Sequence, residues 1–262
     1  KGTKYFGTYR NHALYLSVGG DLDEFWGEMY GKKTGCAKGK AGSMHLSAPS
    51  QGLLVTSAVV GTTIPLAVGN ALAQKYSKSQ NLTVAFFGDG ATEEGVFHES
   101  LNFAALHGLN ILFVCEDNNL AIHSHKSDRQ AYDLQDLVRS YGLLYRSVDG
   151  TDIDKVIGAV KSLFSPVTRD RPRFLHARYH RFLEHVGPNE DFNAGYRGRP
   201  INQEDLDPIK ILEKAKCVEL LETSERLVLG LQVTADIESA VSKAQHAPFA
   251  GPEELMKDVY EA

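Results

Sequence analysis

Two uninterrupted apolar runs, separated by a segment of helical length, constrain the fold of this chain more than any other feature. The runs are LTVAFFGD, residues 82–89, and NILFVCED, residues 110–117. Each has the length of a strand, and an apolar run without alternation is typical of a strand buried on both faces. Residues 93–107 between them predict a helix, expected to pack through one face that carries Val96, Ser100, Phe103 and Leu106. Because a helical crossover joins parallel strands, the three segments predict a βαβ unit.

The alternation of strands and helices continues on both sides of this unit. Helices are expected at residues 65–76, 133–142 and 152–164, and further strands at residues 143–150 and 172–180. This order predicts an α/β fold, with a doubly wound, mostly parallel sheet and helices on both of its faces.

The two ends of the chain differ from this regular middle part. Residues 1–60 are rich in glycine and predict mostly loop, with one short helix at Asp21–Tyr30. The last sixty residues predict helix, from the spacing of Leu212, Cys217, Leu220, Leu221 and Leu227 and then of Ile237, Ala240 and Val241. We expect residues 1–205 to form the α/β domain and residues 206–262 a helical segment packed on it.

The composition excludes several classes of partner. A formal net charge of −5 lacks the basic footprint of a nucleic-acid-binding protein. The sequence contains no stretch of 18 apolar residues, the length needed to span a membrane.

The three cysteines, Cys36, Cys115 and Cys217, lack metal-type spacing and favour reduced thiols in a cytosol-like compartment. Because the sequence begins at Lys1 and runs almost at once into YFGTYR, we expect no signal peptide and a start inside a domain.

Polar residues follow both apolar runs, where the strands are expected to end. The first run leads into Gly88-Asp89-Gly90, and the second leads to Asn118. Because the carboxyl ends of parallel strands open on one edge of a sheet, the Asp89 and Asn118 side chains are expected to converge. Carboxylate and amide oxygens suit Mg²⁺, which commonly bridges a protein to phosphates, and the following helix start favours phosphate. A lone GDG would favour a capped turn instead; the second strand end favours the metal site.

These residues belong to a longer pattern. GDG followed, after twenty-seven residues, by Asn118-Asn119 resembles the thiamine diphosphate motif. The whole stretch 88–119 resembles the alpha subunit of 2-oxo acid dehydrogenases, the decarboxylating component of the pyruvate and acetoin dehydrogenase complexes. The segments TYRNHALYLSVGGD, GKKTGCAKGKAGSMHL, RYHRFLEHVGPNED and PEELMKDVYEA resemble further family segments, and the family's helical N-terminal segment before Tyr5 is absent.

The resemblance implies roles for individual residues. Asp89, Asn118 and the backbone carbonyl of Leu120 would ligate Mg²⁺. It also implies that Tyr9, Arg10 and the backbone amides of Gly90 and Ala91 hold the diphosphate. Ala58 and Val60 would contact the cofactor through backbone or apolar groups. An arginine fork suits phosphate oxygens.

Two histidines match the family's active-site histidines, which face the reactive carbon and the substrate. His12 rests on the YRNH segment, and His185 rests on the loop HVGPNEDFNAGYR. This loop is two residues longer than in the pyruvate dehydrogenases, which leaves His180 as the competing candidate. It also lacks the Ser-x-Ser-Asp pattern of regulatory phosphorylation, so control by a kinase at this loop is not expected.

The implied function is that of the alpha subunit of a two-component enzyme that depends on thiamine diphosphate and Mg²⁺. It would decarboxylate a small, pyruvate-like 2-oxo acid and pass the acyl or hydroxyalkyl group to lipoamide on a lipoyl acyltransferase. In the family a separate beta chain supplies the glutamate that activates the cofactor, and no position here replaces it. An α2β2 heterotetramer and a chain that is inactive alone are therefore expected. The missing phosphorylation pattern suits a bacterial protein, and the reduced cysteines suit a cytoplasmic location.

Two other functions stay open. A related two-component enzyme would pass the group to an aldehyde and form acyloins. A non-catalytic module would bind Mg²⁺ and phosphate without thiamine, but neither GxGxxG nor GxxxxGK[ST] occurs at a strand–helix junction.

Overall fold

The computed structural model describes residues 2–164, 171–215 and 222–257. Its contacts divide the chain into two compact units, which we call the larger and the smaller unit. The larger unit contains residues 60–218 with residues 1–3, and the smaller unit contains residues 4–59 and 219–262. The domain assignment made from the sequence, with its limit at residue 205, stays a prediction.

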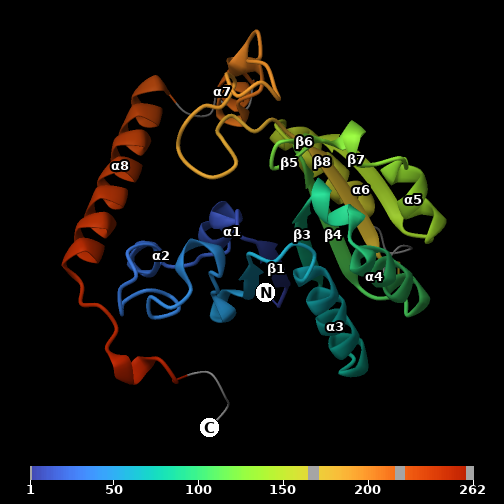
Figure 1. The fold of residues 1–262 in the computed structure, drawn as a ribbon, viewed down its shortest axis with the longest axis horizontal. Helices are drawn as coiled ribbons and strands as arrows, with labels where there is room; N and C mark the ends of the chain where they lie inside the picture. The colour runs from blue at the N-terminus through green and yellow to red at the C-terminus, as the bar shows by residue number, and fades with distance from the viewer. Residues whose placement is uncertain (1, 165–170, 216–221, 258–262) are drawn as a thin grey trace. The chain divides into compact units, whose positions relative to one another are not determined.

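The larger unit is built on four parallel strands in the order β3-β4-β8-β7 (Figure 1). Their bounds are β3 Thr83–Gly88, β4 Ile111–Asp117, β7 Leu144–Asp149 and β8 Arg173–Arg178. The helices of this unit are α3 Thr63–Tyr76, α4 Gly95–Leu106, α5 Leu134–Ser140, α6 Ile153–Leu163 and α7 Pro208–Lys214. A short antiparallel pair, β5 Leu120–Ala121 and β6 Ser124–His125, follows β4.

The strand order places helices on both faces of this sheet. The step from β3 through α4 to β4 and the step from β7 through α6 to β8 run in opposite directions across the sheet. Because crossovers between parallel strands are right-handed, α4 and α6 lie on opposite faces. The predicted doubly wound, mostly parallel α/β fold is therefore confirmed.

An aromatic cluster fills the core between the sheet and α4. Phe87 of β3 contacts Phe97 of α4 at a ring-centroid distance of 5.7 Å, and it contacts Phe113 of β4 and Phe174 of β8 at 6.4 and 5.9 Å. All four rings are buried. Edge-to-face packing of this kind adds to the free energy gained by burying the rings.

The predicted packing face of α4 is wrong except at Ser100. The helix buries Phe97, Ser100, Leu101 and Ala104, whereas Phe103 is 38% exposed and Leu106 is 77% exposed. The physical reason lies before the helix, where Asp89–Glu93 form a 3₁₀ turn and α4 starts at Gly95. This start sets the rotation that points Phe97, not Val96, at Phe87.

The smaller unit contains more regular structure than the predicted loop. Strands β1 Lys4–Thr8 and β2 Leu53–Ser57 pair in parallel, and α1 spans His12–Ser17. The expected short helix is confirmed as α2, Leu22–Met29, whose first turn is capped by the Asp21 carboxylate accepting from the Glu24 amide at 2.9 Å. The core of this unit is a buried cluster of Tyr15, Phe25, Leu46, Ala48 and Leu53.

The long helix α8, Thr223–His246, belongs to the same unit as α2. Its C-terminal part buries Ala240 and Ala244 and packs on α2, where the Lys243 ammonium lies 2.6 Å from the Asp23 carboxylate. Helices α7 and α8 agree with the helical prediction for this end, and Cys217, Leu220 and Leu221 lie outside the described residues. In the part of the chain that the structure describes, no helix combines the length and the apolar character needed to cross a lipid bilayer.

Candidate functional site

The edge of the larger unit at which its strands end carries the first group of predicted site residues. Asp89 follows β3 directly and Asn118 follows β4. The two strands are in register, with Gly88 opposite Glu116, so both side chains leave the sheet at the same edge. Gly90 completes this approach: a Cβ atom there would lie 3.1 Å from Ala121 Cβ, so a glycine lets the Asp89 turn approach β5.

The carboxylate of Asp89 is buried, with 2% of the residue exposed. The Nη2 group of Arg129 donates to its Oδ2 atom at 2.7 Å, and the same guanidinium also binds Glu93. Among the described residues, no side chain donates to the second carboxylate oxygen of Asp89, Oδ1. Burial raises the pKa of the Asp89 carboxyl, and the Arg129 hydrogen bond opposes this rise. One oxygen is thus anchored, and the other can accept a ligand.

The turn after β4 fixes the side-chain amide of Asn118. Its Nδ2 group donates to the hydroxyl of Tyr179 at 2.9 Å, and its Oδ1 atom accepts from the Leu120 amide at 3.0 Å. Asn119 adopts a left-handed conformation with φ of 67°, which the Asp117 carboxylate supports by accepting from its amide at 2.8 Å. These bonds turn the amide oxygen of Asn118 toward the Leu120 segment.

A buried charged network stands behind this turn. His176 Nε2 donates to Oδ2 of Asp117 at 2.6 Å, the Lys126 ammonium donates to the same oxygen, and the Tyr145 hydroxyl lies 2.7 Å from His176 Nδ1. Burial alone would raise the pKa of Asp117, but the hydrogen bonds from His176 and Lys126 hold it well below its usual value. Asp117 is therefore an ionised group that ties the turn to β7 and β8.

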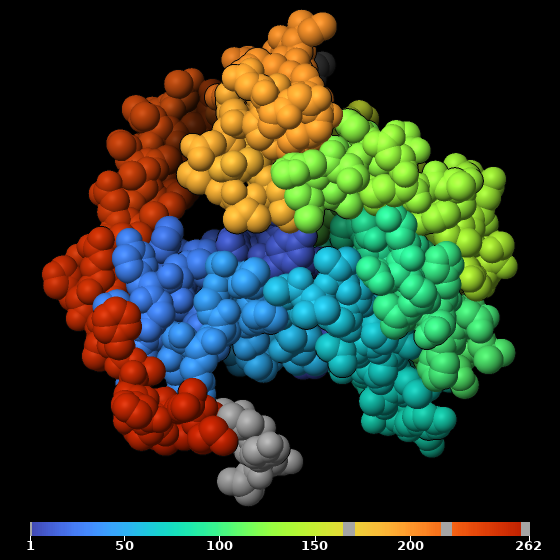
Figure 2. Space-filling view, viewed as in Figure 1, coloured from blue at the N-terminus to red at the C-terminus, as the bar shows by residue number. Residues whose placement is uncertain are grey.

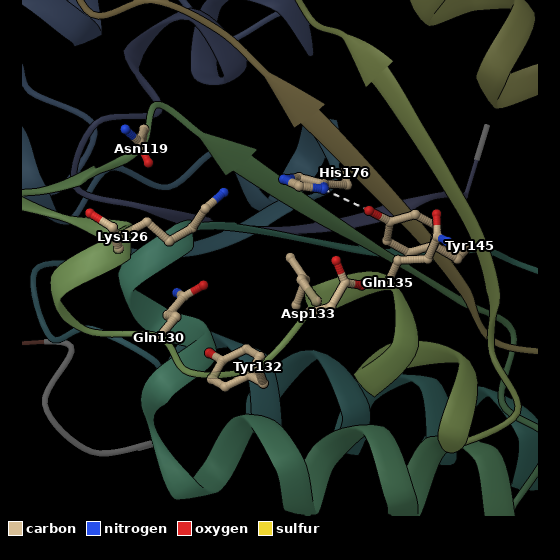
Figure 3. Close-up of a pocket in the computed structure, with 10 residues that line it drawn as sticks. Asn119, Lys126, Gln130, Tyr132, Asp133, Gln135, Tyr145 and His176 are labelled. Atoms are coloured by element: carbon tan, nitrogen blue, oxygen red, sulfur yellow. Dashed lines mark hydrogen bonds between the residues drawn. The ribbon is translucent and has the colours of Figure 1, made fainter.

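The same network forms one wall of a cavity of about 330 Å³, shown in Figure 3. In that view, the upper side of the cavity is lined by Lys126, His176 and Tyr145. Its lower side is lined by Gln130 and Tyr132, which belong to the segment before α5. Gln130 also donates to the Asp89 carbonyl at 3.2 Å, so the cavity and the Asp89 turn share one supporting segment.

Four residues that shape this edge were not predicted from the sequence: Arg129, Asp117, His176 and Tyr179. Asp117 stands beside Asn118 in the EDNN segment, which was a usable signal. The other three come from distant segments, and local spacing gave no signal for them.

A second group of predicted residues lies in the smaller unit. Tyr9 and Arg10 follow β1, with the guanidinium 5.4 Å from the Tyr9 ring centroid, and His12 starts α1. Ala58 follows β2 and is half-buried. The predicted residues thus fall in both units: Val60, Asp89, Gly90, Ala91, Asn118, Leu120 and His185 in the larger, and Tyr9, Arg10, His12 and Ala58 in the smaller.

His12 is held by two contacts within the smaller unit. Its Nε2 atom lies 3.0 Å from the carbonyl oxygen of Ser43. Its ring meets the Phe25 ring edge-on, with centroids 5.6 Å apart.

Both candidate loop histidines lie on one segment of the larger unit, where an aspartate closes the loop. The carboxylate of Asp191 accepts from Arg197 Nε at 2.7 Å and from Arg181 Nη2 at 3.1 Å. His180 stacks on Phe192, and burial followed by the charge of Arg197 lowers the pKa of its imidazole. His185 is half-buried.

The chemistry of the strand-end donors fits a hard divalent cation that shares its coordination with a ligand. No group of three or more His, Cys, Asp or Glu residues that could hold a metal occurs in the described ranges. Any cation here would depend on the Asp89 carboxylate, on amide and carbonyl oxygens, and on oxygens of a bound molecule. That set suits Mg²⁺ held by one carboxylate and by phosphates.

Comparison with known proteins gives three results. Residues 2–253 match the family described as dehydrogenase E1 component. The chain is 33% identical to the alpha subunit of acetoin:2,6-dichlorophenolindophenol oxidoreductase of Bacillus subtilis (strain 168), over 99% of this chain and 78% of that protein. It is 32% identical to the mitochondrial pyruvate dehydrogenase E1 component subunit alpha-1 of Arabidopsis thaliana, over 96% of this chain and 65% of that protein.

A solved transketolase from Leishmania mexicana resembles the structure with a TM-score of 0.55 and 18% identity, over 67% of this chain and 28% of that one. This likeness concerns the fold and agrees with the α/β architecture. The family match spans nearly the whole chain, and both curated relatives exceed 30% identity. The chain therefore belongs to the dehydrogenase E1 component family, among the alpha subunits of its acetoin and pyruvate dehydrogenases.

Proposed function

We propose that the chain is the alpha subunit of a two-component enzyme that uses thiamine diphosphate and Mg²⁺ to decarboxylate a small, pyruvate-like 2-oxo acid. The observation that carries this proposal is the buried Asp89 carboxylate at the end of β3, anchored through Oδ2 beside the oriented amide of Asn118. The names of the relatives, an acetoin oxidoreductase and a pyruvate dehydrogenase, support a small 2-oxo substrate.

In this proposal each group of site residues has one task. Asp89, Asn118 and the Leu120 carbonyl hold Mg²⁺, while the Arg10 guanidinium, Tyr9 and the Gly90 and Ala91 amides hold the diphosphate. Ala58 and Val60 contact the remainder of the cofactor. When bound, thiamine supplies the electron sink for loss of CO₂. His12 and His185 exchange protons with the substrate, with His180 as the alternative to His185.

The proposal includes partners. A beta subunit would complete the site in an α2β2 heterotetramer, and a lipoyl acyltransferase would accept the acyl group in a cytoplasmic, bacterial complex. Transfer to an aldehyde, with acyloin as the product, is the second candidate, because the Bacillus subtilis relative is named for acetoin. The product mixture formed from pyruvate with lipoamide or with an aldehyde separates the two.

Calorimetric titration tests the binding step. Wild-type protein, assembled with its beta partner, is expected to bind thiamine diphosphate only when Mg²⁺ is present. Asp89→Asn removes the ionic ligand and is expected to weaken metal-dependent binding by at least 10–100-fold, the loss that even outer-shell changes cause at metal sites. Asp136→Asn is the control, because Asp136 is exposed on α5.

Three outcomes would contradict the proposal. Binding that is independent of metal, or unchanged in Asp89→Asn, would remove Asp89 from the site. Inorganic diphosphate binding as tightly as thiamine diphosphate would favour a non-catalytic module that recognises Mg²⁺ and phosphate.

A further inference from the structure

A fully buried carboxylate lies inside the glycine- and lysine-rich loop of the smaller unit. Glu28, in the last turn of α2, is 0% exposed. Its Oε2 atom accepts from the amides of Ala37 and Gly39 at 2.8 and 3.0 Å. Its Oε1 atom accepts from the amides of Ala41 and Gly42 at 2.8 and 2.9 Å. One side chain thus anchors four amides within six consecutive residues.

These four amides replace the water that a buried carboxylate gives up. An isolated buried charge is unfavourable, whereas charge-assisted bonds from backbone amides compensate for it. In the described chain Glu28 has no cationic side chain as an ion-pair partner, so the loop amides carry this compensation. The loop conformation and the burial of the carboxylate therefore depend on each other.

The backbone of the loop is shaped to surround this carboxylate. Lys38, Gly39 and Gly42 have positive φ angles of 58°, 75° and 61°, which turn successive amides to one side. At Gly35 a Cβ atom would lie 2.3 Å from Glu28 Oε2, so only a glycine leaves room for the carboxylate.

The loop held by Glu28 leads directly to His12. Ser43 follows Gly42, the last amide bound by the carboxylate, and its carbonyl oxygen lies 3.0 Å from His12 Nε2. A carbonyl oxygen can only accept, so Nε2 is the donor and carries the hydrogen. In the neutral imidazole this leaves the lone pair on Nδ1.

Helix α2 supports His12 from a second direction. Phe25 lies three residues before Glu28 on α2, is buried, and meets the His12 ring edge-on at 5.6 Å. The two side chains lie on neighbouring positions of one helix face. Phe25 thus fixes the plane of the ring, while Glu28, through Ser43, fixes its protonated nitrogen.

We propose that Glu28 is a positioning residue for His12: it fixes the 37–43 loop so that the Ser43 carbonyl holds His12 as the Nε2–H tautomer and leaves Nδ1 as the nitrogen that exchanges protons with the substrate. The catalytic part rests on the proposed function. The positioning part rests on the geometry of the smaller unit alone.

Nuclear magnetic resonance on the full chain tests the positioning. Histidine labelled with ¹⁵N distinguishes the tautomers at about pH 8.5, two units above the usual imidazole pKa of about 6.5. A His12→Asn variant assigns the signal among the ten histidines. In wild-type protein His12 is expected to show an Nε2–H signal, because the bond to Ser43 slows exchange with water. A signal from Nδ1–H would overturn the proposal.

Glu28→Gln tests the link between loop and histidine. Its side-chain NH₂ cannot accept, so two of the four amides lose their acceptor. We expect at least a tenfold faster hydrogen exchange at those amides and loss of the His12 Nε2–H signal. Glu24→Gln, an exposed carboxylate one turn earlier on α2, is the control and should change neither. If the His12 Nε2–H signal persisted in Glu28→Gln although the loop amides exchanged faster, the proposal would be overturned.

A second variant covers the case in which Glu28→Gln does not fold. Glu28→Asp keeps the charge but retracts the carboxylate by one methylene, so it cannot reach both amide pairs. Unchanged exchange at all four amides in Glu28→Asp would contradict the anchoring role.

An activity measurement on the assembled enzyme separates this inference from the proposed function. In Glu28→Gln or Glu28→Asp, kcat is expected to fall about tenfold or more, because a displaced acid–base group loses part of its effect. The Kd for thiamine diphosphate is expected to stay within about twofold. If wild-type protein bound no thiamine diphosphate, the proposed function would fail, and the tautomer and exchange results would still decide the role of Glu28.

Discussion

The buried carboxylate of Asp89 forms an ion pair with Arg129. Substitution of the arginine tests how much this pair contributes to the free energy of unfolding. In Arg129→Met the carboxylate loses its partner, with only 3% of the Asp89 side chain exposed. Breaking a buried ion pair on one side typically costs about 3–5 kcal/mol. We expect a loss in the free energy of unfolding of up to about that size in urea, partly recovered when Mg²⁺ and thiamine diphosphate supply a replacement charge.

Arg199→Met is the matched control for this prediction. Arg199 also pairs with a carboxylate, that of Glu190, but both side chains are about half exposed. Water already solvates such a pair, so no measurable loss is expected. Equal effects of Arg129→Met and Arg199→Met would mean that the Asp89 carboxylate does not depend on Arg129.

At the residue scale, the sequence could predict Asp89 and Asn118 but not their supports. Both residues follow apolar strands directly, so their place at a sheet edge follows from local pattern. Arg129 and Tyr179 lie 40 and 61 residues from the side chains that they hold. Partners at such separations are set by the tertiary fold, which residue spacing does not contain.

Among the elements, the loop that carries His180 and His185 depends on Asp191. Its carboxylate accepts from Arg181 and Arg197, and Arg197 also donates to the carbonyls of Phe182 and Leu183 at 3.2 and 3.0 Å. Burial would raise the pKa of Asp191, but the hydrogen bond and charge of Arg197, with Arg181, lower it below its ordinary value. The ionised carboxylate is thus the form that closes the loop.

The sign of this shift predicts how loop closure depends on pH. A folded-state pKa below the unfolded value, about 3.9 for aspartate, gives stability that is present above about pH 4 and lost as the pH falls through the folded pKa. Asp191→Asn is therefore expected to speed hydrogen exchange in residues 182–197 at pH 7, relative to intrinsic rates. The difference from wild type should shrink as the pH falls below about 4.

Glu190→Gln is the control for this loop, because Glu190 is the exposed neighbour of Asp191 and forms its ion pair with Arg199, not with Arg181 or Arg197. It should leave exchange in residues 182–197 unchanged. Equal hydrogen exchange of this loop in wild type and in Asp191→Asn at pH 7 would show that other contacts close the loop.

The strands were predicted where an apolar run is continuous and were missed where the apolar segment is short. The runs that became β3 and β4 have continuous apolar character, and their buried positions match it. Strands β1 and β2 have five residues each, and glycines precede or interrupt them, so they read as loop. The packing face of α4 was wrong because apolar residues lie all round this helix, and the 3₁₀ turn before it set the rotation.

For the whole molecule, the α/β class followed from the order of strands and helices, but the division into two units did not. The smaller unit joins residues 4–59 to residues 219–262. Such an association between the two ends of a chain rests on tertiary packing, such as that of α8 on α2. The predicted site residues lie in both units. The sequence could therefore predict which residues belong to the site, but not to which unit each of them belongs.

The proposed assembly with a beta subunit makes a prediction about α8. The first half of this helix exposes large apolar side chains, among them Leu227 at 65% and Leu231 at 62%. The helix, red in Figure 2, is open to solvent over much of its length on the face shown. A cluster of exposed apolar side chains marks an interaction surface. In the proposed assembly, the beta subunit is the partner that covers this surface.

Leu227 and Leu231 are four residues apart and share one face of α8. In the double variant Leu227→Glu, Leu231→Glu the chain should keep its thermal stability, because both side chains are already in water. Its assembly with the beta subunit, followed by sedimentation velocity, should weaken at least tenfold, because two charges would have to be buried in the contact. Gln232→Glu with Ser239→Glu adds the same charge at exposed polar positions of α8 and should leave assembly unchanged. Equal assembly of both double variants would place the contact with the beta subunit elsewhere on the chain and would leave the apolar half of α8 to another occupant.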